Sequence, residues 1–503
     1  MNFYITTPIY YVNDRPHIGH AYTSVACDVL ARFKRLAGYN VHFLTGTDEH
    51  GQKVEKSAAA TGVTPKALAD THSQAFRDLT ALMNISNDDF IRTTEPRHVV
   101  SVQALWKKME EGGHIYLGSY SGWYSVRDEA YYQESELVNG KAPTGAEVEW
   151  VEEPSYFFRL SAFGDKLLEH YETNPGFIGP ESRRNEIISF VKGGLKDLSI
   201  SRTTFSWGIP VPGEPKHVMY VWLDALTNYL SALGYPDMEN PLYKTFWPAD
   251  LHMVGKDIIR FHSVYWPAFL LAAGLPLPKR VFAHGWWTIE GEKMSKSLGN
   301  AIAPQALVEE FGLDQTRYFL MREVPFGNDG NFSRERMITV INSELANNIG
   351  NLVQRTLSMI AKNCDGILPK GMQDGEALAV IDFNVMNAMM ARNECDKYIH
   401  AILGYSSEAN EYIDKKAPWA LKKAGKTDEM HTVLYVLAEA IRKIALLLQP
   451  VIPQSSCKIL DQLAVPENQR SFHHLSETFA LIPGTPLPPP QPVFPRFIAK
   501  EGT

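Results

Sequence analysis

Cysteine is scarce in this chain. Four cysteines, Cys27, Cys364, Cys395 and Cys457, occur among 503 residues, and no two of them form a C-x-x-C pair. A disulfide framework and a zinc site built from paired cysteine thiolates are therefore both excluded. The same scarcity predicts a reducing compartment.

Long hydrophobic runs and an excess of positive charge are also missing. No apolar run approaches the roughly 18 residues of a membrane-spanning helix, and the N-terminus enters a strand-like segment without a basic leader. We therefore expect a cytoplasmic protein. The formal net charge is −8, so any RNA partner must be bound by local basic patches. Hydrophobic residues at 45% and charged residues at 21% indicate a soluble, folded chain.

Two lysines three residues apart, Lys293 and Lys296, stand in a hydroxyl-rich segment with the sequence KMSKS. Gly291 and Gly299 flank this segment and allow the backbone to swing and to approach a ligand closely. Lysine ammonium groups at this spacing, with Ser295 between them, can bind a polyphosphate. Alone, however, a K-x-x-K pair is more often a solvated surface feature.

A second motif near the N-terminus makes the lysine segment more informative. His17, Ile18, Gly19 and His20 read HIGH and lie between a strand-like run and a helical pattern. A helix that begins there presents free N–H groups to an anion. Gly19 would let a flat adenine or ribose approach the backbone, and His17 and His20 can donate hydrogen bonds to phosphate oxygens.

Strand and helix patterns alternate over residues 1–115. Apolar runs predict strands at 2–6 and 41–44. Helical periodicity predicts helices at 21–36, 65–83 and 96–111. This alternation predicts an α/β fold with a Rossmann-like parallel sheet, in which ligands bind beyond the carboxyl ends of the strands. The HIGH segment and the acidic segment Thr47–His50 both fall at such ends.

The alternation is interrupted and then resumes. Between about 116 and 210 we expect an inserted β-rich module followed by helices at 156–171 and 184–193. Strands at 218–222, 251–255 and 281–285, with helices to Leu233 and from Asp257, then return to the first pattern. The chain from Ser333 onward is predicted to be helical, with one long helix over 333–362. The proline-rich stretch 483–503 is predicted to be an extended tail.

The two motifs together resemble the signatures of class I aminoacyl-tRNA synthetases, and the chain is similar to the bacterial methionyl-tRNA synthetases over nearly its full length. The resemblance implies that Asp48 pairs with the α-ammonium of methionine. It also implies an amino-acid site formed by Pro8, Ile9, Tyr11, Trp222, Ala225, Leu226, Tyr229, Ile258, His262 and Trp266. A thioether has no charge, so its selection depends on shape, on aromatic contact with sulfur and on a weak donor.

The same resemblance implies the nucleotide site and the chemistry. The residues implied for ATP are His17, Gly19, His20, Gly255, Asp257, Lys293, Ser295 and Lys296. The methionine carboxylate would attack the α-phosphorus, and His17, His20, Lys293 and Lys296 would be the catalytic groups that stabilise the departing pyrophosphate. Mg²⁺ is expected with the nucleotide.

The inserted module departs from the pattern of zinc-bearing relatives. Those relatives carry C-x-x-C pairs at the place where this chain has Ser125, Val126, Arg127 and Asp128, and a further ligand where it has Ala142. Serine and alanine cannot replace zinc-bound thiolates, so we expect no zinc. The module is also too short for a separate editing domain, and a cysteinyl enzyme, which would need a zinc site, is disfavoured.

The C-terminal helices carry a resemblance to anticodon-binding domains. Asn351 and Arg355 are four residues apart, so they share one face of a predicted helix. Trp419, after Pro418, is implied as a stacking platform for an unpaired base. From spacing alone, N-x-x-x-R is more often a solvated helix face. Nearby lysines supply the local positive charge that the whole chain lacks.

Two other functions remain possible on these observations. One is a nucleotidyl transferase that uses the histidine motif without RNA, and the other is a tRNA-binding paralogue without catalysis. The long helical region disfavours the first, and the intact histidines, lysines and Asp48 disfavour the second. We expect a monomer that uses methionine, ATP and the methionine tRNAs, initiator included. The domain bounds are predicted at 1–115 and 211–290 for the two halves of the nucleotide-binding domain, 116–210 for the insertion, 291–345 for the KMSKS and stem-contact region, 346–480 for the helical domain and 481–503 for the tail.

Overall fold

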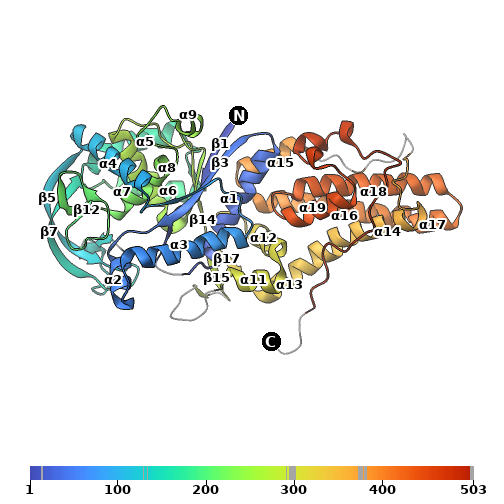
Figure 1. The fold of residues 1–503 in the computed structure, drawn as a ribbon, viewed down its shortest axis with the longest axis horizontal. Helices are drawn as coiled ribbons and strands as arrows, with labels where there is room; N and C mark the ends of the chain where they lie inside the picture. The colour runs from blue at the N-terminus through green and yellow to red at the C-terminus, as the bar shows by residue number, and fades with distance from the viewer. Residues whose placement is uncertain are drawn as a thin grey trace. The chain divides into compact units, whose positions relative to one another are not determined.

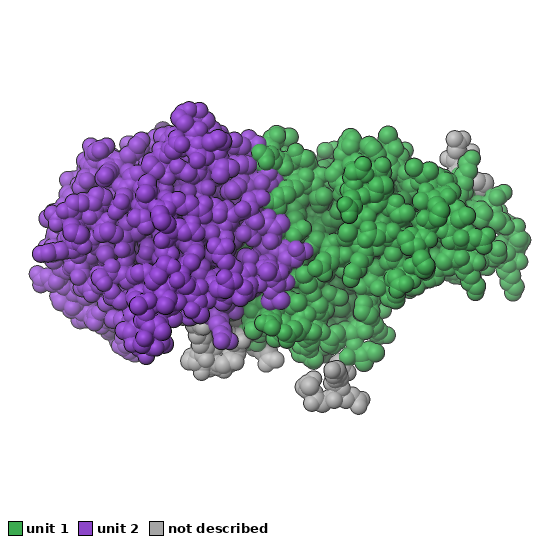
Figure 2. Space-filling model, in the orientation of Figure 1, with its two compact units in different colours: residues 1, 17–40, 285–503 green, residues 2–16, 41–284 purple. Residues whose placement is uncertain are grey.

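The computed structural model describes residues 1–12, 15–128, 130–132, 134–289, 292–293, 302–371, 378 and 382–498. The chain forms two compact units, which Figure 2 shows in different colours. The sheet unit contains residues 2–16 and 41–284, and the helical unit contains residues 1, 17–40 and 285–503. The chain therefore leaves the sheet unit after Pro16 and re-enters it at Val41. The boundaries between these two units lie at different residues from the predicted domain boundaries.

The described residues of the sheet unit include a seven-stranded sheet with the order β2-β3-β1-β13-β14-β8, in which β4 also pairs with β3. Its strands are β1 (Asn2–Thr6), β2 (Tyr10–Tyr11), β3 (Asn40–Asp48), β4 (Asp89–Arg92), β8 (Ile178–Gly179), β13 (Leu251–Gly255) and β14 (Val281–His284). The strands pair in parallel, with Ile5 opposite Leu251 and His252 opposite Val281. The predicted α/β class and Rossmann-like sheet are confirmed.

Helices follow the strands of this sheet (Figure 1). They are α2 (Gln52–Thr61), α3 (Pro65–Leu82), α4 (Pro96–Glu111), α5 (Gly164–Thr173), α6 (Glu181–Lys192), α7 (Val221–Leu226), α8 (Asn228–Ser231), α9 (Pro241–Phe246) and α10 (Trp266–Ala272). Their ends follow from local sequence. Thr64 accepts a hydrogen bond from the Ala67 N–H at 3.2 Å, and Pro65 and Pro96 occupy the first helical position.

The inserted module is β-rich, as predicted. Its described residues form an antiparallel sheet with the order β6-β5-β7-β9, in which Ile115 lies opposite Phe158 and Tyr124 opposite Glu149. The strands are β5 (Ile115–Ser125), β6 (Ala130–Tyr132), β7 (Glu149–Phe158) and β9 (Leu198–Ser199). The expected helix start at Tyr156 is wrong, because residues 156–158 complete β7 and the helix begins at Gly164.

Two segments belong to other sheets than predicted. Ile178 and Gly179, inside the range predicted for the insertion, form β8 and pair with β14 of the parallel sheet. The strand expected at 218–222 instead ends at Met219 as β12 (Glu214–Met219), and it pairs antiparallel with β10 (Ser201–Arg202) and β11 (Pro210–Val211). The apolar run that continues into α7 is equally compatible with a buried helix, so periodicity alone could not separate the two.

The helix expected from Asp257 is irregular. A 3₁₀ turn over Lys256–Ile258 is followed by a π-helical turn over Phe261–Tyr265, and α10 begins only at Trp266. Pro267, in the first turn of α10, has no N–H to donate back to this segment. Short π-helical turns are frequent at functional sites, and His262 lies in this one.

The helical unit begins with α1 (Ile18–Leu36) and includes a small sheet with the order β16-β15-β17. Its other elements are β15 (Trp287–Ile289), β16 (Glu292–Lys293), β17 (Gly330–Phe332), α11 (Pro304–Phe311), α12 (Leu313–Arg322), α13 (Arg334–Val340), α14 (Asn351–Asn363), α15 (Phe383–Ala391), α16 (Cys395–Lys416), α17 (Pro418–Lys423), α18 (Thr427–Leu448) and α19 (Pro453–Gln462). A π-helical stretch, Ile341–Gly350, joins α13 to α14 without a break. The predicted long helix over 333–362 is thus confirmed.

A buried ion pair fixes α1 inside the helical unit. The Arg317 guanidinium of α12 lies 2.7 Å from the Asp28 carboxylate of α1, and both side chains are fully buried. Arg317 also donates to the carbonyl oxygens of Pro450 and Val451, each at 3.0 Å. The guanidinium therefore joins α1 and α12 to the turn after α18, and its charge is compensated within the core.

The proline-rich tail is extended over its described residues, 483–498, which contain no helix or strand. It nevertheless packs against the helical unit. The Phe494 side chain is buried, and the Asn342 side chain exchanges two hydrogen bonds with the Phe497 backbone, at 2.8 and 2.9 Å.

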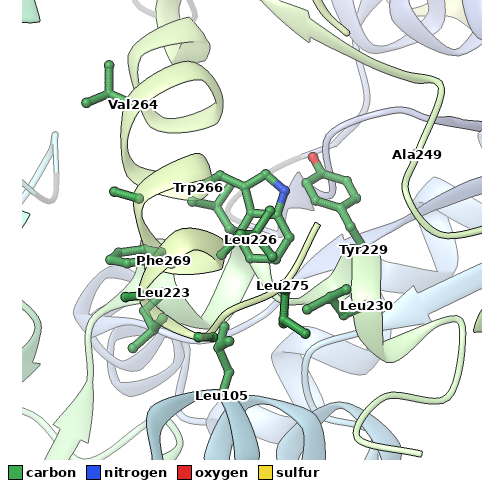
Figure 3. Close-up of a cluster of buried hydrophobic side chains, with 14 of the residues drawn as sticks. Leu105, Leu223, Leu226, Tyr229, Leu230, Ala249, Val264, Trp266, Phe269 and Leu275 are labelled. Carbon is green, nitrogen blue, oxygen red and sulfur yellow. The ribbon is translucent and has the colours of Figure 1, made fainter. Parts of the chain in front are cut away.

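The core of the sheet unit is continuous with the region predicted to bind the amino acid (Figure 3). Leu105 of α4, Leu223 and Leu226 of α7, and Phe269 of α10 contribute to a cluster that also contains Tyr229 and Trp266. Residues of the predicted site are thus held by close packing on their far side. Across the described stretches of the chain, no helix combines the length and the apolar character needed to cross a membrane.

Candidate active site

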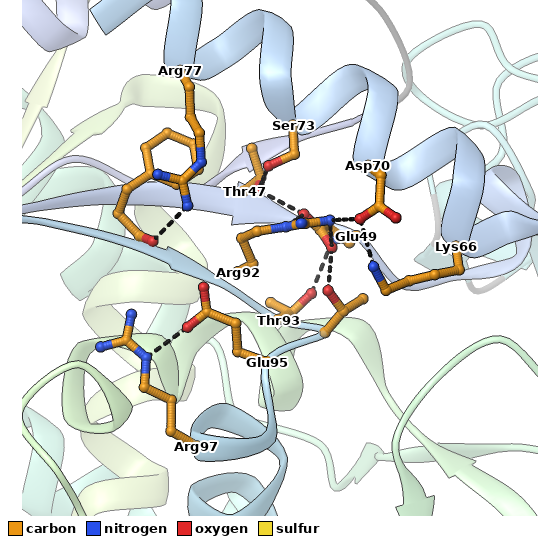
Figure 4. Close-up of polar contacts among 12 residues, drawn as sticks. Thr47, Glu49, Lys66, Asp70, Ser73, Arg77, Arg92, Thr93, Glu95 and Arg97 are labelled. Atoms are coloured by element: carbon orange, nitrogen blue, oxygen red, sulfur yellow. Dashed lines mark hydrogen bonds and ion pairs between the residues drawn. The ribbon is translucent and has the colours of Figure 1, made fainter.

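Two acidic residues, Asp48 and Glu49, occur in succession at the carboxyl end of β3. The buried carboxylate of Glu49 accepts hydrogen bonds from the Arg92 guanidinium at 2.6 and 3.0 Å, and Figure 4 shows Arg92 reaching Asp70 as well. Asp48 is 8% exposed. Side chains alternate in direction along an extended chain, so the Asp48 side chain leaves the chain on the side opposite to Glu49, whose carboxylate is engaged by the framework.

Tyr229 and His262 form a polar pair inside the predicted amino-acid site. The His262 Nδ1 atom lies 2.9 Å from the Ile258 carbonyl oxygen, and Nε2 lies 2.8 Å from the Tyr229 hydroxyl. A carbonyl oxygen only accepts, so Nδ1 carries the proton. Burial lowers the pKa of His262 to about 4, so the ring is neutral near pH 7 and its Nε2 accepts from Tyr229.

Aromatic rings surround this pair. Trp222 stacks on Phe261, with ring centroids 3.8 Å apart and planes 7° from parallel, and it meets the His262 ring edge-on at 6.2 Å. The Tyr229 and Trp266 rings lie 6.0 Å apart. Tyr229, His262 and Trp266 are each 1% exposed or less. The structure thus brings four of the predicted residues, Trp222, Tyr229, His262 and Trp266, into one aromatic cluster. Phe261 was not predicted.

The remaining residues predicted for the amino acid lie on neighbouring segments of the sheet unit. Strand register places Tyr11 of β2 opposite Asp48 of β3. Ala225 and Leu226 are buried in the last turn of α7, and Ile258 ends the 3₁₀ turn before His262. Pro8 is buried and Ile9 partly buried in the segment before β2.

A buried hydrogen-bond network, not anticipated from the sequence, connects these segments. The Asp224 carboxylate of α7 lies 2.6 Å from His50 Nδ1 and 2.7 Å from His98 Nε2. Burial alone would raise the pKa of Asp224, but His50 and His98 bring it down to about 2. His50 lies two residues after Asp48, and Asp224 lies two residues after Trp222. Asp224 therefore fixes the carboxyl end of β3 against α7, which is called the pocket helix below.

The HIGH histidines form the N-cap of α1 in the helical unit. The Gly19 N–H donates to His17 Nδ1, and the His17 N–H donates to His20 Nδ1, each at 3.1 Å. An acceptor nitrogen carries no proton, so both neutral rings hold their proton on Nε2. Burial lowers the pKa of His17, and burial together with His17 lowers that of His20 further. Both rings are thus neutral Nε2–H donors at a helix N-terminus.

Of the other residues predicted to bind ATP, the structure describes Gly255 and Asp257 in full and Lys293 as backbone. Gly255 ends β13, and a Cβ built there would lie 2.6 Å from Oδ1 of Asp257, so a larger residue here would have to displace the Asp257 carboxylate. Lys293 is described as backbone in β16, opposite Thr288. Ser295 and Lys296 lie outside the described residues.

The residues predicted for RNA meet on the helical unit. The Arg355 guanidinium of α14 lies 2.6 Å from the Asp414 carboxylate of α16, and 5.4 Å from the centre of the Trp419 ring of α17. Asn351 is exposed one turn before Arg355. Trp419 is 47% exposed. An arginine over a half-exposed indole can bind a base by stacking and by hydrogen bonds to its edge.

The turn of the inserted module that lacks cysteine is organised around Asp128. Its N–H donates to Ser125 Oγ at 3.2 Å, and its carboxylate accepts from the Tyr132 hydroxyl at 3.0 Å and from the Thr144 hydroxyl. Burial and the Asp128 charge raise the pKa of Tyr132. In the described part of the chain, no group of three or more His, Cys, Asp or Glu side chains could hold a metal ion.

Two protein-family models match the chain. The model described as class I tRNA synthetases (M) matches residues 3–149 and 135–357. The model described as the anticodon binding domain of methionyl tRNA ligase matches residues 376–502. The first match includes the HIGH and KMSKS segments and all residues predicted for the amino acid, and the second includes Trp419.

Curated proteins and solved structures agree with these matches. The chain is 59% identical to the methionine–tRNA ligase of Rickettsia felis and 56% identical to that of Mesorhizobium japonicum, with at least 98% of both chains covered in each case. It is 53% identical to the Mycobacterium tuberculosis methionyl-tRNA synthetase solved in complex with methionyl-adenylate. That comparison has a TM-score of 0.95 and covers 98% of this chain and 100% of that one.

Proposed function

Since the chain belongs to the class I methionine–tRNA ligase family, we propose that the residues described above carry out its two-step reaction. The chain is an ATP-dependent ligase that activates methionine as methionyl-adenylate, releases pyrophosphate and transfers methionine to tRNA. A carboxylate oxygen of methionine attacks the α-phosphorus while the bond to the β-phosphate oxygen breaks. A ribose hydroxyl of tRNA then attacks the methionyl carbonyl carbon, and AMP leaves.

One observation supports methionine as the amino acid most directly. The Tyr229 hydroxyl proton is used by His262 Nε2, and the His262 Nδ1 proton is used by the Ile258 carbonyl. Neither group needs a ligand to satisfy its donor. An uncharged thioether side chain can therefore enter without leaving the Tyr229 or His262 donor unpaired, and its sulfur can contact the rings of Trp222 and Trp266.

We assign the α-ammonium of methionine to Asp48. The neighbouring Glu49 is neutralised by Arg92, so it adds little attraction for a cation. A buried ammonium–carboxylate pair is strong in such surroundings. The Asp224 network would keep Asp48 and the pocket helix in a constant relative position, which orients the methionine carboxylate for attack.

We assign the phosphates of ATP to the Nε2–H groups of His17 and His20. Neutral donors at a helix N-terminus stabilise phosphate oxygens as charge moves toward the leaving pyrophosphate. Gly19 leaves the backbone open to the nucleotide, and a Cβ there would lie 2.9 Å from the His17 ring. Lys293 and Lys296 are assigned to the pyrophosphate from the family pattern. Gly255 and Asp257 are assigned to the nucleoside.

The metal content we propose is Mg²⁺ with ATP and no zinc. Mg²⁺ keeps several waters and binds largely through substrate phosphates, so it needs no dedicated protein cage. The zinc proposal rests on the donor set. Ser125 and Ala142 offer no thiolate, and the Asp128 carboxylate already accepts from Tyr132 and Thr144. Elemental analysis of the purified protein should find no stoichiometric zinc, and one zinc per chain would overturn this proposal.

The RNA contacts we propose are Arg355 and Asn351 with base edges and Trp419 with a base face, all in the anticodon of methionine tRNAs, initiator included. Arg355 lies over the Trp419 ring, which supports joint recognition of one unpaired base. We further propose that the protein works as a cytoplasmic monomer.

The proposed activity is tested by exchange of labelled pyrophosphate into ATP. Methionine should support exchange without tRNA, and other amino acids should not. Tyr229→Phe and His262→Ala should mainly weaken discrimination against apolar methionine analogues, with the KM for ATP little changed. Exchange supported by a different amino acid, or a KM for ATP that moves with these variants, would contradict the assignment of the pocket.

A further inference from the structure

Tyr229 of the proposed amino-acid site is held at three points. Its hydroxyl lies 2.8 Å from His262 Nε2, and its backbone carbonyl accepts a hydrogen bond from the Tyr4 hydroxyl of β1 at 2.9 Å. The face of its ring lies on the ring of His252 of β13, with the ring centroids 4.0 Å apart and the planes 28° from parallel. The first contact lies within the pocket, and the other two come from the parallel sheet.

The His252 ring is in turn fixed by the neighbouring strand. Thr6 of β1 stands opposite His252 in the parallel register, and its Oγ1 atom lies 2.8 Å from His252 Nδ1. Both residues are fully buried. This hydrogen bond sets the rotation of the imidazole, so the plane of the ring that Tyr229 meets is determined by the pairing of β1 with β13.

A histidine is a costly residue at this place in the sheet. His252 lies in a strand whose neighbouring residues, Leu251 and Met253, are apolar and buried. Its Nε2 atom has no hydrogen-bond partner among the residues that the structure describes, and burying a polar atom in this way costs free energy. Burial and the nearby His262 lower the pKa of His252 well below its ordinary value, so the ring is neutral near pH 7. An aliphatic side chain would avoid the cost, but it would offer Tyr229 no flat ring to stack on.

We propose that His252 is a positioning residue that supports the selection of methionine by setting the plane of the Tyr229 ring. The inference rests on the proposed function, because it assigns His252 to the same amino-acid site. His252 acts through Tyr229: the stacked imidazole keeps the phenol ring in the orientation in which its hydroxyl donates to His262 Nε2. A ring that turned away would leave that hydroxyl and that nitrogen unpaired in the pocket. The discrimination against apolar analogues that we propose for Tyr229 and His262 therefore depends on His252.

The first test measures discrimination in amino-acid-dependent pyrophosphate exchange, as the ratio of kcat/KM for methionine to kcat/KM for norleucine, in which a CH₂ group replaces the sulfur. His252→Asn keeps a polar side chain beside Thr6 but removes the ring. It should lower the ratio by roughly 2- to 12-fold, the range for one lost aromatic contact, with the KM for ATP little changed.

His42→Asn is the matched control for this test. It removes another buried histidine ring from the same sheet, one that contacts the rings of Tyr4 and Phe246. It should lower stability and leave the ratio at the wild-type value. An unchanged ratio in His252→Asn, or an equal fall in the two variants, would overturn the proposal.

The second test asks whether His252 acts through Tyr229. In the Tyr229→Phe background the hydroxyl is already absent, so the addition of His252→Asn should change the ratio by less than about twofold. Two effects that multiply would show that His252 acts on the pocket by another route, which would overturn the proposal. Failure of the proposed function would be recognised separately, as absent methionine-dependent exchange in the wild type or as an unchanged ratio in Tyr229→Phe alone.

The third test changes Thr6 and leaves the His252 side chain in place. Thr6→Val keeps the shape of the side chain but removes the hydroxyl, so the ratio should fall, by less than in His252→Asn. Thr6→Ser keeps the hydroxyl and should retain the wild-type ratio, although loss of the methyl group lowers the stability measured by urea unfolding. Equal ratios in the two Thr6 variants would contradict the proposal that the sheet sets the ring plane through Thr6.

Discussion

The proposed amino-acid pocket and the proposed RNA-binding face on the helical unit (the RNA face) both use aromatic and basic side chains, in opposite surroundings. In the pocket, Tyr229 and His262 are almost fully buried, and burial lowers the pKa of His262 to about 4. On the helical unit, Arg355 lies over a half-exposed Trp419 and is paired with Asp414. The Tyr229–His262 pair is satisfied internally, and we propose that the pocket selects a small ligand by shape. The RNA face leaves the Trp419 ring and the Arg355 guanidinium partly exposed to solvent. This exposure suits the binding of an unpaired base from solution.

This comparison has an energetic consequence. A change in the pocket removes a group that cannot be replaced by water, so it should act on both stability and the chemical step. A change on the RNA face leaves solvent in place of the lost group and should act on tRNA use alone. The predictions below test that contrast, from the largest expected effect to the smallest.

The largest effect is expected for Asp48→Asn. Removing the charge that pairs with a buried ammonium is expected to cost about 3–5 kcal/mol, which lowers kcat/KM for methionine by roughly 10²- to 10³-fold or more. Glu49→Gln is the matched control, because Glu49 is neutralised by Arg92 within the framework. It should lower stability without a comparable loss in kcat/KM for methionine. Equal kinetic losses in the two variants would show that Asp48 is structural.

Asp224→Asn should follow in size. Two histidines depend on this fully buried carboxylate, and removing one partner of a buried pair leaves the others uncompensated. We expect the free energy of unfolding to fall by about 3 kcal/mol, as measured by urea unfolding, and the KM for methionine to rise. Asp165→Asn, on an exposed helix start, should cost less than about 1 kcal/mol. A similarly small loss of stability for Asp224→Asn would show that the Asp224 network does not hold the site together.

Trp419→Ala and Arg355→Ala change the RNA face, so they should lower the use of tRNA. One stacking contact or one bidentate arginine contact is worth about 1–3 kcal/mol, so each variant should reduce aminoacylation efficiency by roughly 5- to 150-fold. Pyrophosphate exchange without tRNA should stay near the wild-type rate. If both activities fell together, Arg355 and Trp419 would be supporting the catalytic fold and the contrast between the two regions would fail.

The smallest effect is the pH dependence that His262 gives to stability. The pKa of His262 is about 4 in the folded protein and about 6.5 in an unfolded chain. Between these values the unfolded chain binds a proton that the folded protein does not, so stability falls as pH falls. We expect a loss of about 1.2 kcal/mol between pH 6 and pH 5. His262→Gln should flatten this part of the profile, and an unchanged profile would show that the buried ring does not titrate as described.

The sequence was most informative where local chemistry determines structure. The helix over 96–111 is bounded by Pro96 at its first position and Gly112 after its end, and both residues act within one turn. The strand over 2–6 was likewise predicted from its own apolar residues. Such signals sufficed for the fold class and for the long helix beyond Ser333.

Features that depend on distant partners could not be predicted in this way. The run 218–222 is apolar enough for a strand or a buried helix, and only pairing with β10 and β11 ends the strand at Met219. The Asp224 network joins residues 126 and 174 positions apart, so no spacing reveals it. One signal was present: an aspartate inside the apolar run of residues 220–226 would be costly to bury unpaired.

The packed C-terminal tail determines where this chain can be shortened or extended. Phe494 lies against Gly350, where an added Cβ would approach it to 3.3 Å. The Phe497 ring lies beside the Phe311 ring, tilted by 35°, with the ring centroids 5.0 Å apart. The proline-rich composition of residues 483–503 suggests a truncation before Pro483. Such a truncation would expose these apolar contacts on the helical unit and should favour aggregation. An affinity tag placed after Thr503 preserves them. For purification and crystallisation, residues up to Phe497 therefore count as part of the folded body.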